Sequence, residues 1–174
     1  MATSVALQRT EGKPVTITPV EKVMERINQM SQAIMQRAYE IFEGNGRNFG
    51  HDLDNWFRAE ADLLHPVHVI ISDAGESLEV KAEVPGFSEK EIEVSVEPRR
   101  LTITGKRETE TSREENKGKT VYSEFCSNQI LRIVDLPASV DTEKTTASLK
   151  NGVLQLTMPK AAKAKTVEIK PRAA

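Results

Sequence analysis

The sequence predicts an all-β fold, an antiparallel β-sandwich, with an α-helical N-terminal arm and a short extended C-terminal tail. Two observations predict this fold class. Apolar residues recur about every four positions up to Leu64 and every second position from Val67 onward, which are the periods of helices and of half-buried strands. The alternating segments are short and are joined by turn pairs such as Asn151-Gly152. We expect an arm over residues 1–64, a sandwich over 65–160 and an extension over 161–174.

The arm is predicted to hold two helices. The first begins at Thr18-Pro19-Val20-Glu21, with Thr18 as N-cap, and stops at Gly44-Asn45-Gly46. Its apolar residues form one stripe: Val20, Val23, Met24, Ile27, Met30, Ile34, Met35, Ala38, Ile41 and Phe42. A shorter helix follows, capped by Asp52 and ended by Pro66. We expect one side of this second helix to carry Leu53, Trp56, Phe57, Leu63 and Leu64.

The strands are predicted from alternation between apolar and polar residues. Alternating segments occur at residues 67–71, 78–84, 92–96, 101–104 and 154–158. Residues 130–136 are apolar on both faces apart from Arg132 and Asp135, so we expect that strand to be covered on two sides. Asn151-Gly152 predicts a hairpin, because this pair tolerates positive φ at both turn positions. The charged segment 106–121 cannot contribute to a core and is predicted to be a loop that is either functional or solvent-exposed.

Composition excludes several classes of function. The 174 residues carry a formal net charge of −2, with acidic and basic residues interspersed. The sequence lacks the clusters of Lys and Arg with stacking aromatic residues that are typical of nucleic-acid binding, so we expect no nucleic-acid partner. No apolar run is long enough to span a membrane, and the single cysteine, Cys126, fits a reducing compartment. We therefore expect a cytoplasmic protein. No catalytic constellation, metal-ligand cluster or phosphate-binding loop is present in the sequence, so we expect no enzyme activity and no cofactor.

Several motifs together resemble the α-crystallin domain of the small heat-shock proteins. They follow in the order Pro85-Gly86-Phe87, residues 101–107, Leu136-Pro137 and residues 151–154, and Val167-Glu168-Ile169 lies in the tail. The chain departs from the family pattern at Ser127-Asn128 and at Ile130. The resemblance implies an immunoglobulin-like sandwich that works as an ATP-independent holdase in a homo-oligomer and binds unfolding client proteins. The alternative is a β-sandwich interaction module or co-chaperone adaptor that binds one specific partner.

The resemblance also implies three sets of site residues. Val167 and Ile169 would dock on a neighbouring subunit as an oligomerisation motif. A dimer interface would comprise Val67, Val69, Ile71, Val121, Tyr122, Glu124 and Arg132, with Glu124 as the ion-pair partner of Arg132. The helix stripe supplies the candidates for client binding: Met24, Ile27, Met30, Ile34, Met35, Ile41 and Phe42.

Each of these three assignments has an open alternative. Residues 167–169 would also fit as one more strand of the same domain. Arg132 would also fit as a side chain that extends to solvent along its aliphatic stem. The helix stripe would also fit as a surface that packs helix against helix inside an assembly.

Overall fold

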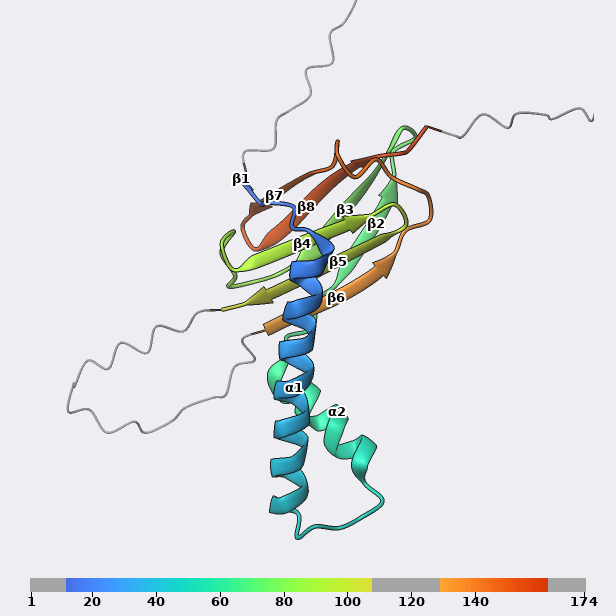
Figure 1. Cartoon of the computed structure of the whole chain (residues 1–174). Helices are drawn as coiled ribbons and strands as arrows, with labels where there is room; N and C mark the ends of the chain where they lie inside the picture. The colour runs from blue at the N-terminus through green and yellow to red at the C-terminus, as the bar shows by residue number, and fades with distance from the viewer. Residues whose placement is uncertain (1–11, 108–128, 163–174) are drawn as a thin grey trace, which may run out of the picture.

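The fold is a sandwich of two antiparallel sheets, from one end of which a pair of helices projects (Figure 1). The computed structural model describes residues 12–107 and 129–162. One sheet has the strand order β1-β7-β8-β3-β2 and the other the order β4-β5-β6. The strands are β1 (Lys13–Pro14), β2 (Val69–Asp73), β3 (Ser77–Glu83), β4 (Ile92–Glu97), β5 (Arg100–Lys106), β6 (Gln129–Asp135), β7 (Thr146–Lys150) and β8 (Val153–Pro159). The predicted β-sandwich is confirmed.

The alternating segments place one face of each strand in the core. β3 and β8 pair with Val80 opposite Leu156 and Ala82 opposite Leu154, so apolar residues of both strands share the inner face. The β7–β8 hairpin turns at Asn151 (φ 51°) and Gly152 (φ 75°), as predicted for two positive-φ positions. The largest fully buried side chains of the sandwich core are those of Leu78, Val80, Val84, Val94, Leu101, Ile103, Ile130, Leu154, Leu156 and Met158.

Two helices, α1 (Val20–Gly44) and α2 (Asp52–Leu63), form an antiparallel hairpin. The first part of α1 lies against β4 and β5, and the rest continues beyond the sandwich (Figure 1). The predicted N-cap is wrong, because Pro19 occupies that position and no side chain caps the helix. The backbone N–H of Thr18 instead donates to the carbonyl of Val94 on β4 at 2.7 Å, so this threonine ties the chain to the sheet.

The predicted apolar side of α2 is also wrong in part. Leu53 and Phe57 are 70% and 60% exposed, whereas Ala59 is fully buried and Asn55 is 6% exposed. The buried side of α2 is set by its contact with α1, where the small Ala59 packs in one cluster with Ile34 and Ile41. A salt bridge of 2.9 Å between Arg37 and Asp62 joins the two helices beside this contact.

The strand over residues 130–136 is not covered on two sides. In β6, Ile130 is fully buried, but Arg132 is exposed and Ile133 is 49% exposed. The physical reason is that β6 is the last strand of the three-stranded sheet and faces a groove rather than a packed layer.

Residues 13–18 lie on the sandwich, although the sequence assigned them to the helical arm. β1 pairs with β7, and Val15 is 5% exposed within the sandwich core. Ile17 forms a parallel bridge with Val94 of β4. Residues Val15-Thr16-Ile17-Thr18 are all β-branched and alternate between apolar and polar, which is the signal for extended chain in this segment.

Candidate functional site

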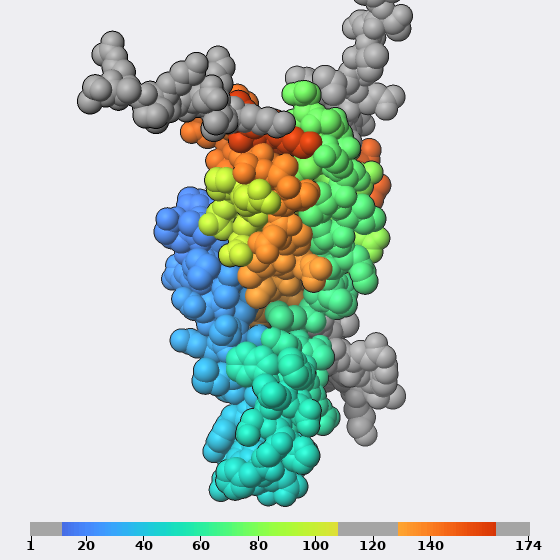
Figure 2. All heavy atoms as spheres, turned by 90° about the vertical axis from the view of Figure 1, so that its right-hand side faces the viewer, coloured from blue at the N-terminus to red at the C-terminus, as the bar shows by residue number. Residues whose placement is uncertain are grey.

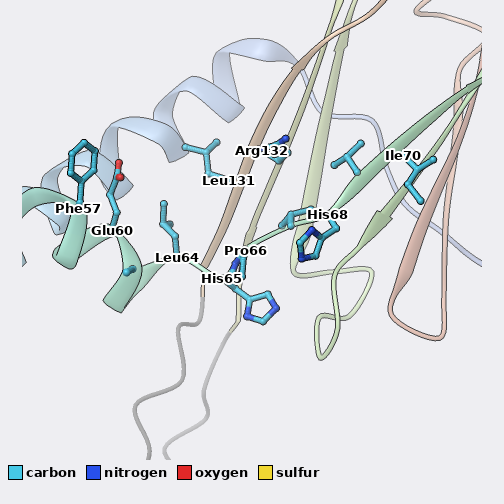
Figure 3. A pocket seen from close by; sticks show the side chains of 12 residues that line it. Phe57, Glu60, Leu64, His65, Pro66, His68, Ile70, Leu131 and Arg132 are labelled. Carbon is cyan, nitrogen blue, oxygen red and sulfur yellow. The ribbon is translucent and has the colours of Figure 1, made fainter.

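A groove of about 840 Å³ lies between β2 and β6, above the helical hairpin. Figure 2 shows this face, with the orange atoms of β6 beside the green atoms of β2. Four segments line the groove (Figure 3): the end of α2, the connection from α2 to β2, the start of β2, and β6. The lining residues are Phe57, Glu60, Ala61, Leu64, His65, Pro66, Val67, His68, Val69, Ile70, Leu131 and Arg132.

The connection from α2 to β2 is fixed against β6 by backbone contacts. Leu64 forms a parallel bridge with Gln129, and the N–H of His65 donates to the Gln129 carbonyl at 2.7 Å. Pro66 cannot donate a backbone hydrogen bond and disfavours helix at the residue before it, so the chain leaves α2 extended. These contacts place the first residues of the sandwich beside β6 and define one wall of the groove.

β2 is the last strand of the five-stranded sheet and pairs only with β3 among the described strands. Its outer side therefore presents backbone N–H and C=O groups that no described strand satisfies, which is the usual template for adding a strand from another chain. Ile70, on this edge, is 64% exposed. Together these features make the edge of β2 suited to binding an extended peptide segment.

The groove is mainly apolar, and its polar residues do not form a catalytic arrangement. Glu60, His65, His68 and Arg132 line it, but no ion pair or hydrogen bond joins their side chains in the described ranges. Within residues 12–107 and 129–162, no group of three or more His, Cys, Asp or Glu side chains is close enough to hold a metal ion. In the same ranges, no helix is long and apolar enough to cross a membrane.

The structure brings three of the predicted interface residues together. Val67, Val69 and Arg132 line the groove, whereas Ile71 packs half-buried against the sandwich core. Val121, Tyr122 and Glu124 lie outside the described residues, as does the tail pair Val167 and Ile169. Sequence reasoning missed Phe57, Leu64, Ile70 and Leu131 as groove residues. Leu131 directly precedes Arg132 in a strand with exposed positions, but no periodic signal marks it as part of a groove.

A second hollow of about 370 Å³ lies on the helical hairpin, away from the sandwich. It is lined by Met35, Ala38, Tyr39, Phe42, Phe49, Asp52 and Asn55. The rings of Phe42 and Phe49 pack edge to face with centroids 5.4 Å apart. Phe49 is nevertheless 85% exposed, so this aromatic cluster is open to a partner.

The predicted client-binding stripe is divided by the hairpin. Met30, Ile34 and Ile41 are buried, and the last two pack with Ala59 of α2, so these three side chains are not accessible in this structure. Ile27 and Phe42 are half-buried. Met24 and Met35 are 50% and 61% exposed and remain accessible.

A charged contact holds α1 on the sandwich. Glu93 of β4 accepts hydrogen bonds from Arg26 and forms a 3.2 Å salt bridge with Lys22. Burial alone would raise the pKa of Glu93, but the bonds from Arg26 and Lys22 outweigh burial and lower the pKa below its ordinary value. Glu93 is therefore the ionised anchor of the helical arm at neutral pH.

Comparisons with known proteins agree with this architecture. The model of the Hsp20/alpha crystallin family matches residues 70–172, and a model for a protein of unknown function, DUF2934, matches residues 29–64, which span most of the hairpin. A probable 15 kDa heat shock protein of Leptospira interrogans is 34% identical over 116 residues, covering 67% of this chain and 85% of the relative. Small heat shock protein C2 of Rickettsia felis is 34% identical, covering 63% of this chain and 69% of the relative.

Among solved structures, heat shock protein 16.0 of Schizosaccharomyces pombe is similar, with a TM-score of 0.49 and 25% identity. The match covers 63% of this chain and 99% of that one.

Proposed function

The chain belongs to the Hsp20/alpha crystallin family, whose small heat shock proteins are ATP-independent chaperones rather than enzymes, and we propose that it is a holdase. It binds unfolding proteins, prevents their aggregation without ATP and works as a homo-oligomer in the cytoplasm. The observation that carries the proposal is the pairing of an open sheet edge with a separate exposed aromatic cluster on the hairpin. The first serves assembly and the second serves client binding.

The dimer forms at the groove between β2 and β6. A segment of the partner near Val121, Tyr122 and Glu124 adds to the free edge of β2 and satisfies its backbone groups. Main-chain hydrogen bonds supply affinity, and the apolar wall at Val67 and Val69 buries side chains of the added segment. Arg132 at the groove wall meets Glu124 of the added segment, which neutralises a charge at the edge of the contact.

The dimers join through the tail. Val167 and Ile169 alternate with Glu168, so an extended tail projects both branched side chains to one side. Burying these two side chains contributes about 3–6 kcal/mol before the cost of ordering the tail is subtracted. One tail is thus a weak contact, and many together hold an oligomer whose subunits still exchange.

Client proteins bind the exposed apolar residues of the helical hairpin. Met24 and Met35 have flexible thioethers that adapt to irregular surfaces, and Tyr39 and Phe49 offer large apolar area beside Met35. Ile34 and Ile41, which pack with Ala59 of α2, join this surface only if the two helices separate. The functional units are the arm over residues 1–64, the sandwich over 65–160 and the extension over 161–174, with residues 13–18 of the arm packed on the sandwich.

An aggregation assay on the full chain tests the proposal. A heat-denatured model client is incubated with and without the protein in the absence of nucleotide, and light scattering measures aggregation of the client. In a separate sample that contains only the protein, light scattering measures the particle mass. We expect suppression of aggregation by a particle several times heavier than 19.4 kDa. A 19.4 kDa species at every concentration that leaves the client to precipitate would contradict the proposal and favour an adaptor.

A further inference from the structure

The hollow on the helical hairpin combines aromatic rings with a carboxylate. Its lining residues come from the second half of α1, from the loop between the helices and from the start of α2, at the end of the hairpin that lies away from the sandwich (Figure 1). Tyr39, Phe42 and Phe49 supply three rings, and Asp52 supplies a negative charge. Ring faces carry a negative potential that attracts cations, and a carboxylate adds to this attraction. The lining therefore has the composition of a cation site.

The loop that carries Phe49 is held in place by hydrogen bonds. The backbone N–H of Arg47 donates to the Phe42 carbonyl at 3.0 Å, and Arg47 has a positive φ of 60° where the chain turns away from α1. The side-chain amide of Asn45 donates to Oδ1 of Asn55 at 3.4 Å, which joins the loop to α2. Both walls of the hollow are thus in position in the free chain.

The aromatic rings leave faces free for a ligand. In an edge-to-face pair such as Phe42 and Phe49, the ring that contacts through its edge keeps its own faces free. Tyr39 packs on Phe42 at a centroid distance of 6.1 Å with the ring planes tilted by 38°. Tyr39 is 57% exposed and Phe49 is 85% exposed, so these two rings can be reached from solvent.

The carboxylate of Asp52 has no ionic partner in the described ranges, where no side chain bonds to it. Nearby basic side chains contact other acids: Arg47 bonds to Glu43 at 2.9 Å, and His51 contacts Asp54 at 3.3 Å. An apolar segment that covered the hollow would take water from the Asp52 carboxylate without replacing it, which is unfavourable. A segment that brings a cation compensates for this loss.

We propose that the hollow binds an arginine side chain of an unfolding client, with the guanidinium group against the rings of Tyr39 and Phe49 and close to Asp52. Apolar neighbours of this arginine contact Met35 and Ala38 in the same lining. The inference rests on the client binding at the hairpin in the proposed function. It specifies the segments that are selected, namely arginine flanked by apolar residues.

Arginine fits this lining better than lysine does. A guanidinium group is planar, stacks on aromatic rings and is weakly hydrated, so it loses less when it leaves water. The ammonium group of lysine is a compact and strongly hydrated charge. A hollow of about 370 Å³ has room for one arginine side chain and part of an apolar neighbour.

Each contact in the hollow is weak by itself, which suits a chaperone that must release its clients. An exposed ion pair contributes little, and a cation beside an exposed ring contributes only slightly more. Affinity therefore requires the rings and the carboxylate to act on the same group. In an oligomer, several hollows that bind one client chain strengthen the contact further.

Labelled peptides test this selectivity on the full chain. The probe is a fluorescein-labelled unstructured peptide with three Leu-Arg-Leu units joined by Gly-Ser linkers, and matched peptides carry citrulline or lysine in place of arginine. Fluorescence anisotropy measures the affinity of each peptide. Citrulline keeps the shape of arginine but is neutral, so we expect about ten-fold weaker binding of the citrulline peptide and an intermediate affinity for lysine.

Asp52→Asn is expected to weaken binding of the arginine peptide about five-fold and to leave binding of the citrulline peptide unchanged. Asp54→Asn is the matched control. Both residues lie in the first turn of α2, so both variants change the charge at this helix end, but only Asp52 lines the hollow.

Tyr39→Leu with Phe49→Leu keeps apolar side chains around the hollow but removes two rings. We expect about five-fold weaker binding of the arginine peptide. Phe57→Leu is the control, because Phe57 is a 60% exposed aromatic residue of the same hairpin that does not line the hollow. Circular dichroism verifies that each variant is folded, and the comparison of arginine with citrulline on the wild-type chain needs no variant.

Equal affinity of the wild-type chain for the arginine and citrulline peptides overturns the arginine site. Equal losses in Asp52→Asn and Asp54→Asn overturn it as well, and so does absence of binding by the arginine peptide. Suppression of client aggregation in the same samples measures holdase activity separately. A chain that protects the client without distinguishing the two peptides keeps the proposed function and loses this inference, whereas a wild-type chain that fails to protect contradicts the proposed function itself.

Discussion

Arg26 of α1 and Glu93 of β4 are joined by two hydrogen bonds, with 3.2 Å between Nη2 and Oε1 and 3.4 Å between Nε and Oε2. The Glu93 side chain is only 12% exposed, so the contact is better shielded from water than the surface ion pairs of this chain. It connects a helix that projects from the sandwich to the outer strand of the three-stranded sheet. The position of the helical arm therefore depends on the charge of one carboxylate.

Glu93→Gln is expected to lower the free energy of unfolding by about 1 kcal/mol, because a neutral amide accepts weaker hydrogen bonds from Arg26 and Lys22. Denaturant unfolding monitored by circular dichroism measures this difference. Glu79→Gln is the matched control, since Glu79 is exposed on β3. Equal losses in the two variants would show that the Glu93 contact contributes nothing specific.

The effect of Glu93→Gln is expected to depend on pH. The pKa of Glu93 in the folded chain lies below its ordinary value of 4.5, so the folded chain takes up this proton less readily than the unfolded chain. The carboxylate therefore stabilises the fold above pH 4.5, and the stabilisation is lost as the pH falls through the lowered pKa. We expect a constant difference between wild type and Glu93→Gln from about pH 7 to about pH 5.5, shrinking below pH 4.5. A difference that grows with acidity would contradict the assignment.

Ile70→Lys is expected to weaken the dimer at least ten-fold, because the added ammonium group must lose water when a second chain covers the edge of β2. Ile70 is 64% exposed in the single chain, so the change is expected to leave the fold stable. Sedimentation of V167A/I169A protein across a dilution series measures dimer dissociation without interference from larger assemblies. Leu53→Lys on α2 is the control, since Leu53 is 70% exposed but does not line the groove.

Val167→Ala with Ile169→Ala is expected to reduce the oligomer towards dimers, because the tail then buries less apolar surface in each contact. Loss of up to about 4 kcal/mol per tail is multiplied by the number of tails that act together. Light scattering measures the particle mass, and Glu168→Ala is a matched control within the same motif. An unchanged mass in the double variant would exclude the tail as the contact between dimers.

Alternation in the sequence was sufficient to predict the inner strands, because their neighbours on both sides belong to the same sheet. β3 and β8 pair over their whole length, so each alternate residue meets an apolar partner and the period of two is complete. The burial of the strand β6, at the edge of its sheet, was predicted less well. Of the exposed residues of β6, Arg132 lines a groove, whereas Ile133 does not, so the expected cover is missing for both side chains. The groove depends on the distant connection at Leu64 and His65, which bonds to Gln129.

The periodicity of the sequence also predicted the packing of the two helices only in part. Of the stripe on α1, Val23, Met30, Ile34 and Ile41 are buried, whereas Met24 and Met35 are 50% and 61% exposed, so the stripe is wider than the surface that packs. On α2 the small Ala59 allows close approach to α1, and Leu53 and Phe57 are left in solvent despite their hydrophobicity. β1 consists only of Lys13 and Pro14, which show no strand pattern, although the β-branched residues 15–18 that follow it indicate extended chain.

This packing changes how the client surface is best tested. Deleting residues 1–50, which would remove the whole first helix, also removes Val15 from the sandwich core and so confounds stability with client binding. Met35→Ser with Phe49→Ser is a sharper change, because both side chains are exposed around one hollow, at 61% and 85%. We expect a several-fold loss of client protection with the free energy of unfolding changed by less than about 0.5 kcal/mol.

The aggregation assay compares this double variant with Leu53→Ser, which removes an equally exposed apolar side chain from the same hairpin outside the hollow. If clients bind by general hydrophobicity alone, each lost apolar side chain reduces protection to a similar extent. If they bind the aromatic cluster, protection falls in the double variant and persists in Leu53→Ser, because only the former removes the two groups that flank Tyr39 and Phe42. Full protection by both variants would move the client site away from the hairpin, and the exposed edge of the sandwich at Ile70 would be the next surface to test.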